Sequence, residues 1–150
     1  MADAYLTALT MLSRRELSEA QVRTRLARKE FAADDIDAAV ERLLQDGTLN
    51  DRRVALAAAR LESAVRHRGR SRVIQKLRTL GIGSEIAESA VSEVFEEVDE
   101  GALLDRAFER RLRGQEPKDL DAKGRGRIVR GLAGQGFAIE AILKRLRGLQ

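Results

Sequence analysis

Residues 77–82 read Leu-Arg-Thr-Leu-Gly-Ile, and the same pattern recurs at 26–31 as Leu-Ala-Arg-Lys-Glu-Phe and at 132–137 as Leu-Ala-Gly-Gln-Gly-Phe. The copies begin 51 and 55 residues apart. Each copy ends with an apolar residue that stands five positions after its leucine and directly after a Gly or a Glu. This is the spacing of a Schellman helix end, in which one residue takes a left-handed conformation and the next packs back on the last helical turn. The three stretches therefore predict three helices that end in the same way.

Glu30 occupies the left-handed position of the first copy, where the other two copies have Gly81 and Gly136. A residue with a Cβ pays about 1 kcal/mol more than glycine for this conformation. We therefore expect the first of the three helix ends to be strained at Glu30.

Apolar residues recur at steps of three and four along nearly the whole chain, and no segment shows the period-two alternation of a strand. This pattern predicts an all-α protein. Ser18 with Gln21 forms a capping box, Asn50 precedes a helix, and Gly47 follows one. The helices expected from these signals lie near 6–12, 18–29, 34–46, 50–68, 71–80, 84–98, 100–113, 122–135 and 139–149.

The apolar stripes of these helices predict which side chains face the core. The helix over 122–135 has the lowest intrinsic propensity, because it contains four glycines that each cost about 1 kcal/mol relative to alanine. We expect it to depend on tertiary contacts and to fray. Apolar side chains expected on buried stripes include Leu6, Leu44, Leu61, Val65, Ile139, Leu143 and Leu149.

Nine helices with three equivalent ends suggest three tandem three-helix repeats, over residues 3–47, 49–99 and 100–149. Repeats of this kind stack into an elongated, curved array whose extended surface suits macromolecular partners better than small molecules. The alternative is a single globular bundle in which similar helix ends arose independently. The threefold spacing favours the repeat.

The composition removes most catalytic and metal-binding chemistry. Among 150 residues there are no cysteines, one histidine and one proline, so disulfide frameworks, zinc clusters and thiol chemistry lack their residues. The longest stretch without a charge, 4–13, is shorter than the roughly 18 apolar residues that a membrane span needs. No basic and apolar leader opens the chain, and we expect a cytoplasmic protein without a membrane association.

The remaining motifs do not indicate an active site. His67 lies between Arg66 and Arg68 with no carboxylate near in sequence, which favours a surface histidine. There is no G-x-S-x-G elbow, and the glycines at 124–128 lack the order of a phosphate-binding loop. We therefore expect no enzyme, no catalytic residue, no cofactor and no metal.

The charge distribution indicates where an anionic partner could bind. The chain has 28 basic and 24 acidic residues, and the stretch from Ser63 to Ser84 contains no acid at all. Arginine binds phosphates through a planar fork, without reading a base sequence. Only four Phe and one Tyr are present, so a stacking platform for bases is not expected. The candidate contacts are Arg66, Arg68, Arg70, Arg72, Lys76, Arg78, Lys123, Arg125, Arg127 and Arg130.

Two other interpretations of these basic stretches stay open. A charge block is often only a solvated helix face, and a cationic face could also meet an acidic protein. For any single arginine, solvation and partner contact have about equal support.

Five segments in order carry a resemblance to a known family: 8–18 (Ala-Leu-Thr-Met-Leu-Ser-Arg-Arg-Glu-Leu-Ser), 26–31 followed by 40–47, Leu49-Asn-Asp with Ala55, Arg68-Gly-Arg with 77–82, and 132–137 with Ala141-Ile-Leu. On these segments the chain resembles the RecX regulatory proteins, bacterial modulators of the RecA recombinase, over nearly its whole length. It departs from the family pattern at Glu30, where glycine is expected. It also departs at Gly124, Gly126 and Gly131, which leave the third repeat with fewer side chains to pack.

The resemblance implies tandem three-helix repeats and a role in recombination, DNA repair and the SOS response. It implies a monomeric, non-enzymatic protein that binds the RecA filament on single-stranded DNA and limits filament growth, strand exchange and ATP hydrolysis. The alternative is a sequence-independent binder of single- or double-stranded DNA that acts only by competing for the strand. A third possibility is a structural adaptor for some other protein.

Overall fold

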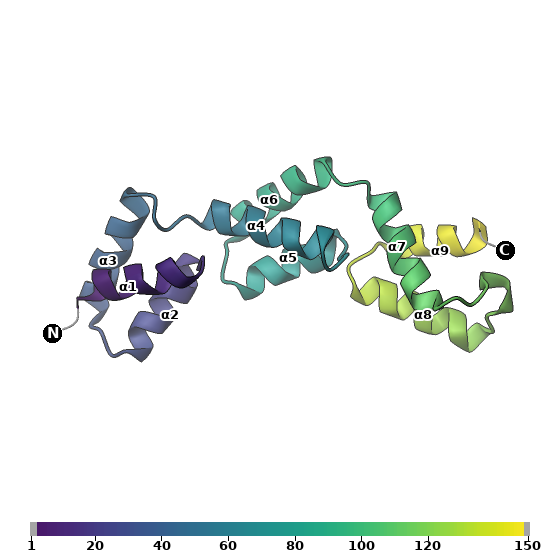
Figure 1. The fold of residues 1–150 in the computed structure, drawn as a ribbon, viewed down its shortest axis with the longest axis horizontal. Helices are drawn as coiled ribbons and strands as arrows, with labels where there is room; N and C mark the ends of the chain where they lie inside the picture. The colour runs from purple at the N-terminus through teal and green to yellow at the C-terminus, as the bar shows by residue number, and fades with distance from the viewer. Residues whose placement is uncertain (1–2, 149–150) are drawn as a thin grey trace. The chain divides into compact units, whose positions relative to one another are not determined.

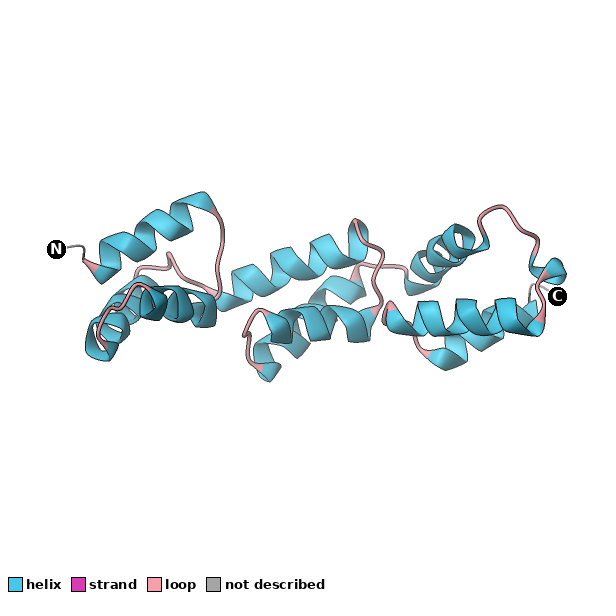
Figure 2. Ribbon diagram, turned by 90° about the horizontal axis from the view of Figure 1, so that it is seen from below, coloured by secondary structure: helices cyan, strands magenta, loops and turns pink. Residues whose placement is uncertain are grey.

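The computed structural model describes residues 3–148, and within this range the chain contains α-helices, one short 3-10 turn and no strand (Figure 2). The helical class predicted from the sequence is therefore confirmed. The elements are α1 (Ala4–Arg14), α2 (Glu19–Arg28), α3 (Ala33–Gln45), α4 (Asp51–Ala64), α5 (Arg70–Thr79), α6 (Ser84–Glu96), α7 (Glu100–Leu112), η1 (Pro117–Asp119), α8 (Ala122–Gly134) and α9 (Ile139–Gly148).

The predicted caps set several of these boundaries. Ser18 Oγ accepts from the Gln21 amide while Gln21 Oε1 accepts from the Ser18 amide, which completes the capping box of α2. Asn50 Oδ1 accepts from the Arg53 amide at the start of α4. Gly47 ends the turn after α3 with a φ of 78°. The largest boundary differences are at α4, which ends at Ala64 rather than 68, and at α1, which is longer than expected.

The chain divides into two compact units, Met1–Ala58 with Leu77–Ala90 and Ala59–Lys76 with Val91–Gln150. In the first unit α1 packs on α2 and α3, around a core in which Leu17, Leu26 and Leu43 are fully buried (Figure 1). In the second unit α8 packs on α7 and α9, and Phe108 and Leu132 lie in the interior. Each such buried side chain contributes roughly 1.5–3 kcal/mol of transfer free energy.

The three equivalent helix ends are confirmed. Glu30, Gly81 and Gly136 have φ angles of 67°, 81° and 101°, all left-handed. The amides of Phe31, Ile82 and Phe137 donate to the carbonyls of Leu26, Leu77 and Leu132 at 3.3, 3.1 and 3.2 Å. The amides of the three left-handed residues donate three positions back, at 2.9–3.0 Å. Both hydrogen bonds of the Schellman motif are thus present in every copy.

The second and third of these helix ends also form a joint with the start of an earlier helix. In the first unit, the Leu80 carbonyl accepts from Ser18 Oγ, and a Cβ at Gly81 would overlap the Cβ of Ala20. In the second unit, the Gly136 carbonyl accepts from Ser71 Oγ at 3.1 Å, and a Cβ at Gly136 would overlap the backbone of Arg72. Gly81 and Gly136 are therefore required both by their φ angles and by close backbone approach.

Glu30 differs because its side chain is exposed. It carries the conformational cost of a positive φ but not the steric cost that a Cβ would bring at Gly81 or Gly136. This difference explains how the first copy tolerates a side chain at the left-handed position.

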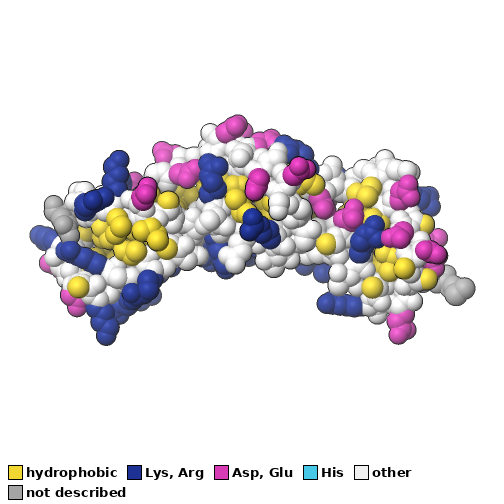
Figure 3. Space-filling model, turned by 180° about the vertical axis from the view of Figure 1, so that it is seen from behind, with side chains coloured by type: hydrophobic (Ala, Val, Ile, Leu, Met, Phe, Trp, Pro, Cys, Tyr) yellow, Lys and Arg dark blue, Asp and Glu magenta, His cyan; other side chains and the backbone are white. Residues whose placement is uncertain are grey.

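Several predicted buried side chains are exposed, and these predictions were wrong. Leu6 is 59% exposed and Leu61 48%, because the helices turn small residues inward: Ala4 and Ala8 in α1, and Ala55 and Ala59 in α4. Val65 follows the end of α4 and is also exposed. Hydrophobic side chains accordingly reach the surface in several places (Figure 3). The exposed side chains that had been expected on buried stripes are Leu6, Leu44, Leu61, Val65, Ile139 and Leu143. Leu149 lies outside the described residues.

The glycine-rich helix α8 is regular from Ala122 to Gly134, and Asp121 Oδ1 caps it by accepting from the Gly124 amide at 2.7 Å. Its glycines also leave room for neighbours, because a Cβ at Gly131 would overlap the guanidinium of Arg111. The fraying expected of this helix is not seen within Ala122–Gly134. Its dependence on tertiary contacts stays a prediction, which the close approach of Arg111 supports. The division into repeats over 3–47, 49–99 and 100–149 is separate from the two compact units and stays a prediction.

The helix-end geometry predicts opposite effects of two substitutions on the free energy of unfolding. Glu30→Gly removes the left-handed penalty and should raise this free energy by up to about 1 kcal/mol. Gly136→Ala adds that penalty and a clash with the Arg72 backbone, and should lower it by more than 1 kcal/mol. Urea denaturation measures both. A clearly lower midpoint for Glu30→Gly would contradict the account of the first helix end.

Candidate functional site

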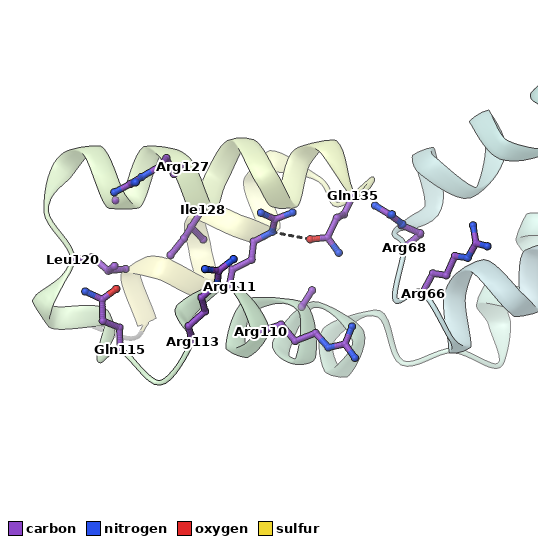
Figure 4. A pocket seen from close by; sticks show the side chains of 12 residues that line it. Arg66, Arg68, Arg110, Arg111, Arg113, Gln115, Leu120, Arg127, Ile128 and Gln135 are labelled. Atoms are coloured by element: carbon purple, nitrogen blue, oxygen red, sulfur yellow. Dashed lines mark hydrogen bonds between the residues drawn. The ribbon is translucent and has the colours of Figure 1, made fainter.

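The second unit contains a cavity of about 650 Å³ whose wall is dominated by guanidinium groups. We call it the arginine cavity. Figure 4 shows that its side chains come from four segments: the loop after α4, the C-terminal half of α7, the connection between α7 and α8, and α8 with the residue directly after it. The arginines that line it are Arg66, Arg68, Arg110, Arg111, Arg113 and Arg127.

Left-handed residues place the arginines of two of these segments. His67 has a φ of 53°, and it turns the chain after α4 so that the Arg68 amide donates back to the Glu62 carbonyl at 2.9 Å. Arg113 caps α7 with a φ of 51°, and Gly114 continues the turn with 85°. Helix α8 then presents Arg127 from its exposed face.

Two of the six arginines have partners within the protein. Arg66 Nη1 pairs with Glu62 Oε1 at 3.1 Å, and the Glu62 side chain is only 5% exposed. Arg111 donates to Gln135 Oε1 at 2.8 Å and to the Gly131 carbonyl at 3.1 Å. Both acceptors of Arg111 are neutral, so they fix its guanidinium without cancelling its charge.

The other four arginines of the cavity, Arg68, Arg110, Arg113 and Arg127, form no ion pair or side-chain hydrogen bond with any residue in 3–148. Six arginines and one ion pair leave five uncompensated positive charges around one cavity. The floor is apolar, with Ala107 and Ile128 buried. Such a site attracts anions, and arginine holds phosphate or carboxylate oxygens through paired hydrogen bonds.

No aromatic side chain is among the described residues that line the cavity. A nucleic-acid base bound there would have no ring on which to stack, and stacking is what most single-strand binders add to their basic grooves. The cavity therefore suits recognition of charge rather than of bases.

His67 lies at the surface, as the sequence suggested, but it is partly covered. Its Nδ1 has no hydrogen-bond partner among the described residues. Burial lowers the pKa of His67 below its usual value of 6.5, and the nearby charges of Arg110 and Arg106 lower it further. Both effects disfavour the protonated form of the imidazole.

The structure brings together only some of the ten site residues predicted from the sequence. Arg66, Arg68 and Arg127 line the cavity. Arg70 instead pairs with Glu100 at 2.8 Å and lies 5.2 Å from the centroid of the Phe95 ring, and Arg72 donates to Gln75 at 2.8 Å. Those that lie elsewhere, in addition to Arg70 and Arg72, are Lys76, Arg78, Lys123, Arg125 and Arg130.

Sequence reasoning missed Arg110, Arg111 and Arg113, which make up half of the lining arginines. Glu109 and Glu116 flank this run, so it does not form an acid-free stretch like 63–84. A signal was present, however: three arginines in four residues directly before Gly114, at a predicted helix end.

No group of three or more potential metal ligands occurs among residues 3–148, and none of the helices described is long and apolar enough to cross a membrane.

Comparison with known proteins decides the family. A sequence model of the first three-helix domain of RecX matches residues 4–43. The regulatory protein RecX of Syntrophotalea carbinolica is 36% identical over 136 residues, which cover 91% of this chain and 89% of that protein. This chain belongs to the RecX family. The regulatory protein RecX of Trichlorobacter lovleyi is 34% identical over 94% of this chain and 92% of its own length.

Solved structures of RecX share the fold. A crystal structure of the regulatory protein RecX superposes with a TM-score of 0.83 at 19% identity, over 97% of this chain and 70% of that one. RecX from Lactobacillus salivarius superposes with a TM-score of 0.77 at 23% identity, over 96% of this chain and 94% of that one. The resemblance found in the sequence is thus confirmed, and so is its helical fold.

The environment of His67 predicts a pH dependence of stability. Because its pKa is lower in the folded chain than the value of 6.5 expected when unfolded, the unfolded state binds more protons below that pH. Stability should therefore fall as the pH drops from 7.5 to 5.5. His67→Asn keeps a residue that tolerates a positive φ and removes the titrating group. Urea midpoints of both proteins at the two pH values test this, and an equal fall in both would contradict it.

Proposed function

We propose that this RecX-family chain is a non-enzymatic regulator of the RecA recombinase. It binds the RecA filament on single-stranded DNA, limits filament growth, and so restrains strand exchange and the ATP hydrolysis coupled to it. Membership of the RecX family supports RecA as the partner, and the arginine cavity supports binding to an anionic filament. The protein acts as a monomer in the cytoplasm and needs no cofactor.

The arginine cavity is the observation that carries the proposal. A nucleoprotein filament presents phosphates and carboxylates, and each is a bidentate acceptor for a guanidinium. Arg68, Arg110, Arg113 and Arg127 have no internal partner among the described residues and are available for such contacts.

Of the residues chosen from sequence, we propose that Arg66, Arg68 and Arg127 contact the filament within the cavity. The other seven are contacts outside it: Arg70, Arg72, Lys76, Arg78, Lys123, Arg125 and Arg130. Arg66 and Arg70 are the weakest of the ten, because their pairs with Glu62 and Glu100 already use part of each guanidinium.

We also propose that the chain consists of three tandem three-helix repeats, over 3–47, 49–99 and 100–149. The support is the threefold Schellman end and the repeated joint, in which the second and third ends pack on the start of an earlier helix.

A sequence-independent DNA-binding function is the second candidate. No aromatic side chain occurs among the described residues that line the cavity, which favours contacts to the phosphate backbone of DNA and not to its bases. This protein would affect RecA only by occupying the strand. Its affinity would fall with salt, with a slope of log affinity against log salt of roughly −0.7 per phosphate contacted on a single strand.

Single-stranded-DNA-dependent ATP hydrolysis by the cognate RecA separates the two candidates. With the chain added far below the amount that saturates the strand, the filament regulator should inhibit hydrolysis. The DNA binder should have no effect until the strand is covered. Inhibition only once the strand is covered would contradict binding to the RecA filament.

A pair of substitutions tests the cavity in the same assay. Arg113→Asn with Arg127→Gln removes two cavity charges, and each lost charge-assisted hydrogen bond costs about 1.5–3 kcal/mol. At least ten times more protein should be needed for half inhibition.

Arg60→Gln with Lys144→Gln is the matched control, because both side chains are exposed, lie outside the cavity, and have no side-chain partner within residues 3–148. It should inhibit like the unchanged chain. Equal inhibition by the cavity variant would locate the contacts elsewhere.

A further inference from the structure

We infer that the arginine cavity is a site for short linear polyphosphates, which it recognises by their charge and without contact to a base. The triphosphate group of a free nucleotide and inorganic tripolyphosphate share this chemistry. The inference goes beyond filament binding, because it needs neither RecA nor DNA.

The order of the side chains fits a linear ligand. Figure 4 shows Arg127 at one end of the cavity, Arg111 and Arg113 in its middle, and Arg66 and Arg68 at the other end. A row of guanidiniums can contact consecutive phosphate groups, each through a pair of hydrogen bonds. The dashed bond in Figure 4 from Arg111 to Gln135 fixes the middle of this row.

The charge density favours a polyphosphate. Five uncompensated positive charges surround about 650 Å³. Neighbouring phosphates in a polyphosphate share a bridging oxygen, whereas those of a nucleic-acid backbone are separated by a sugar. A polyphosphate therefore brings more negative charge into the same volume, and it neutralises more of the repulsion among the arginines.

The lining offers few groups that could recognise the nucleoside part of a nucleotide. Among the described residues that line the cavity there is no aromatic ring for stacking and no carboxylate. The neutral polar side chains are Gln115 and Gln135, of which Gln135 already accepts from Arg111, and the six arginines outnumber them. Affinity should therefore depend on the number of phosphates and not on the nucleoside attached.

His67 provides a direct reporter, because it is the only histidine in the chain. Its neighbours Arg66 and Arg68 line the cavity, and the charge of Arg110, which also lines it, lowers its pKa. A polyanion in the cavity cancels these charges, so the pKa of His67 should rise on binding. The ring resonances of one histidine, followed by NMR over a pH titration, measure this without competing signals.

The experiment uses the full chain alone, titrated separately with inorganic tripolyphosphate, ATP and inorganic phosphate. Tripolyphosphate and ATP should bind within about threefold of each other and at least tenfold more tightly than phosphate, and both should raise the pKa of His67. ATP that binds more than tenfold more tightly than tripolyphosphate would overturn the inference, because it would show recognition of the nucleoside. No binding of tripolyphosphate would also overturn it.

Two double variants locate the binding. Arg113→Asn with Arg127→Gln should weaken tripolyphosphate binding at least tenfold, while Arg60→Gln with Lys144→Gln, which removes the same net charge, should change it less than twofold. An equal effect of the two variants would show binding to the overall charge of the chain and would overturn the site. Because RecA and DNA are absent, the result is independent of the ATP hydrolysis assay, and either proposal can fail alone.

Discussion

The left-handed residue at the end of a helix is the constraint on which the rest of this structure depends. At Gly81 and Gly136 the chain makes both Schellman hydrogen bonds and then packs its backbone against the first turn of an earlier helix. A side chain at either position would prevent that approach. One conformational feature thus ends a helix, starts the next one, and joins segments more than sixty residues apart, as in the bond from Ser71 to the Gly136 carbonyl.

The same joint builds the arginine cavity. The Gly69 amide donates to the Gln135 carbonyl at 2.7 Å, which places Arg68, the residue before Gly69, beside the end of α8. The side chain of Gln135 in turn holds Arg111. The backbone of one residue therefore fixes one cavity segment and its side chain fixes another. The site is a consequence of how the helix end docks, and a change in the joint would alter the spacing of the guanidiniums.

Sequence patterns predicted the helix ends well because their hydrogen bonds are local and their spacing is fixed. They failed for the buried faces of α1 and α4, because Leu6 and Leu61 satisfy the helical period as well as the buried alanines do. Only tertiary packing decides between two such stripes. The site was half predicted: Arg66, Arg68 and Arg127 were found through charge, but the contribution of α7 depends on tertiary proximity. His67 shows the same limit, since the charges of Arg106 and Arg110, which lower its pKa, belong to residues distant in sequence.

The cavity arginines that have internal partners are held in two ways, by a carboxylate or by neutral acceptors. Where a guanidinium is compensated, as Arg66 is by the nearly buried Glu62, the pair holds the end of α4. Arg111 is instead held by two neutral acceptors, the side-chain amide of Gln135 and the carbonyl of Gly131, so no opposite charge lies on its guanidinium. A carboxylate at either place would bind the guanidinium more strongly, but it would cancel the charge on which anion binding depends. Like charges held together in this way cost stability until a ligand neutralises them, so an anion that binds the folded chain should also stabilise it.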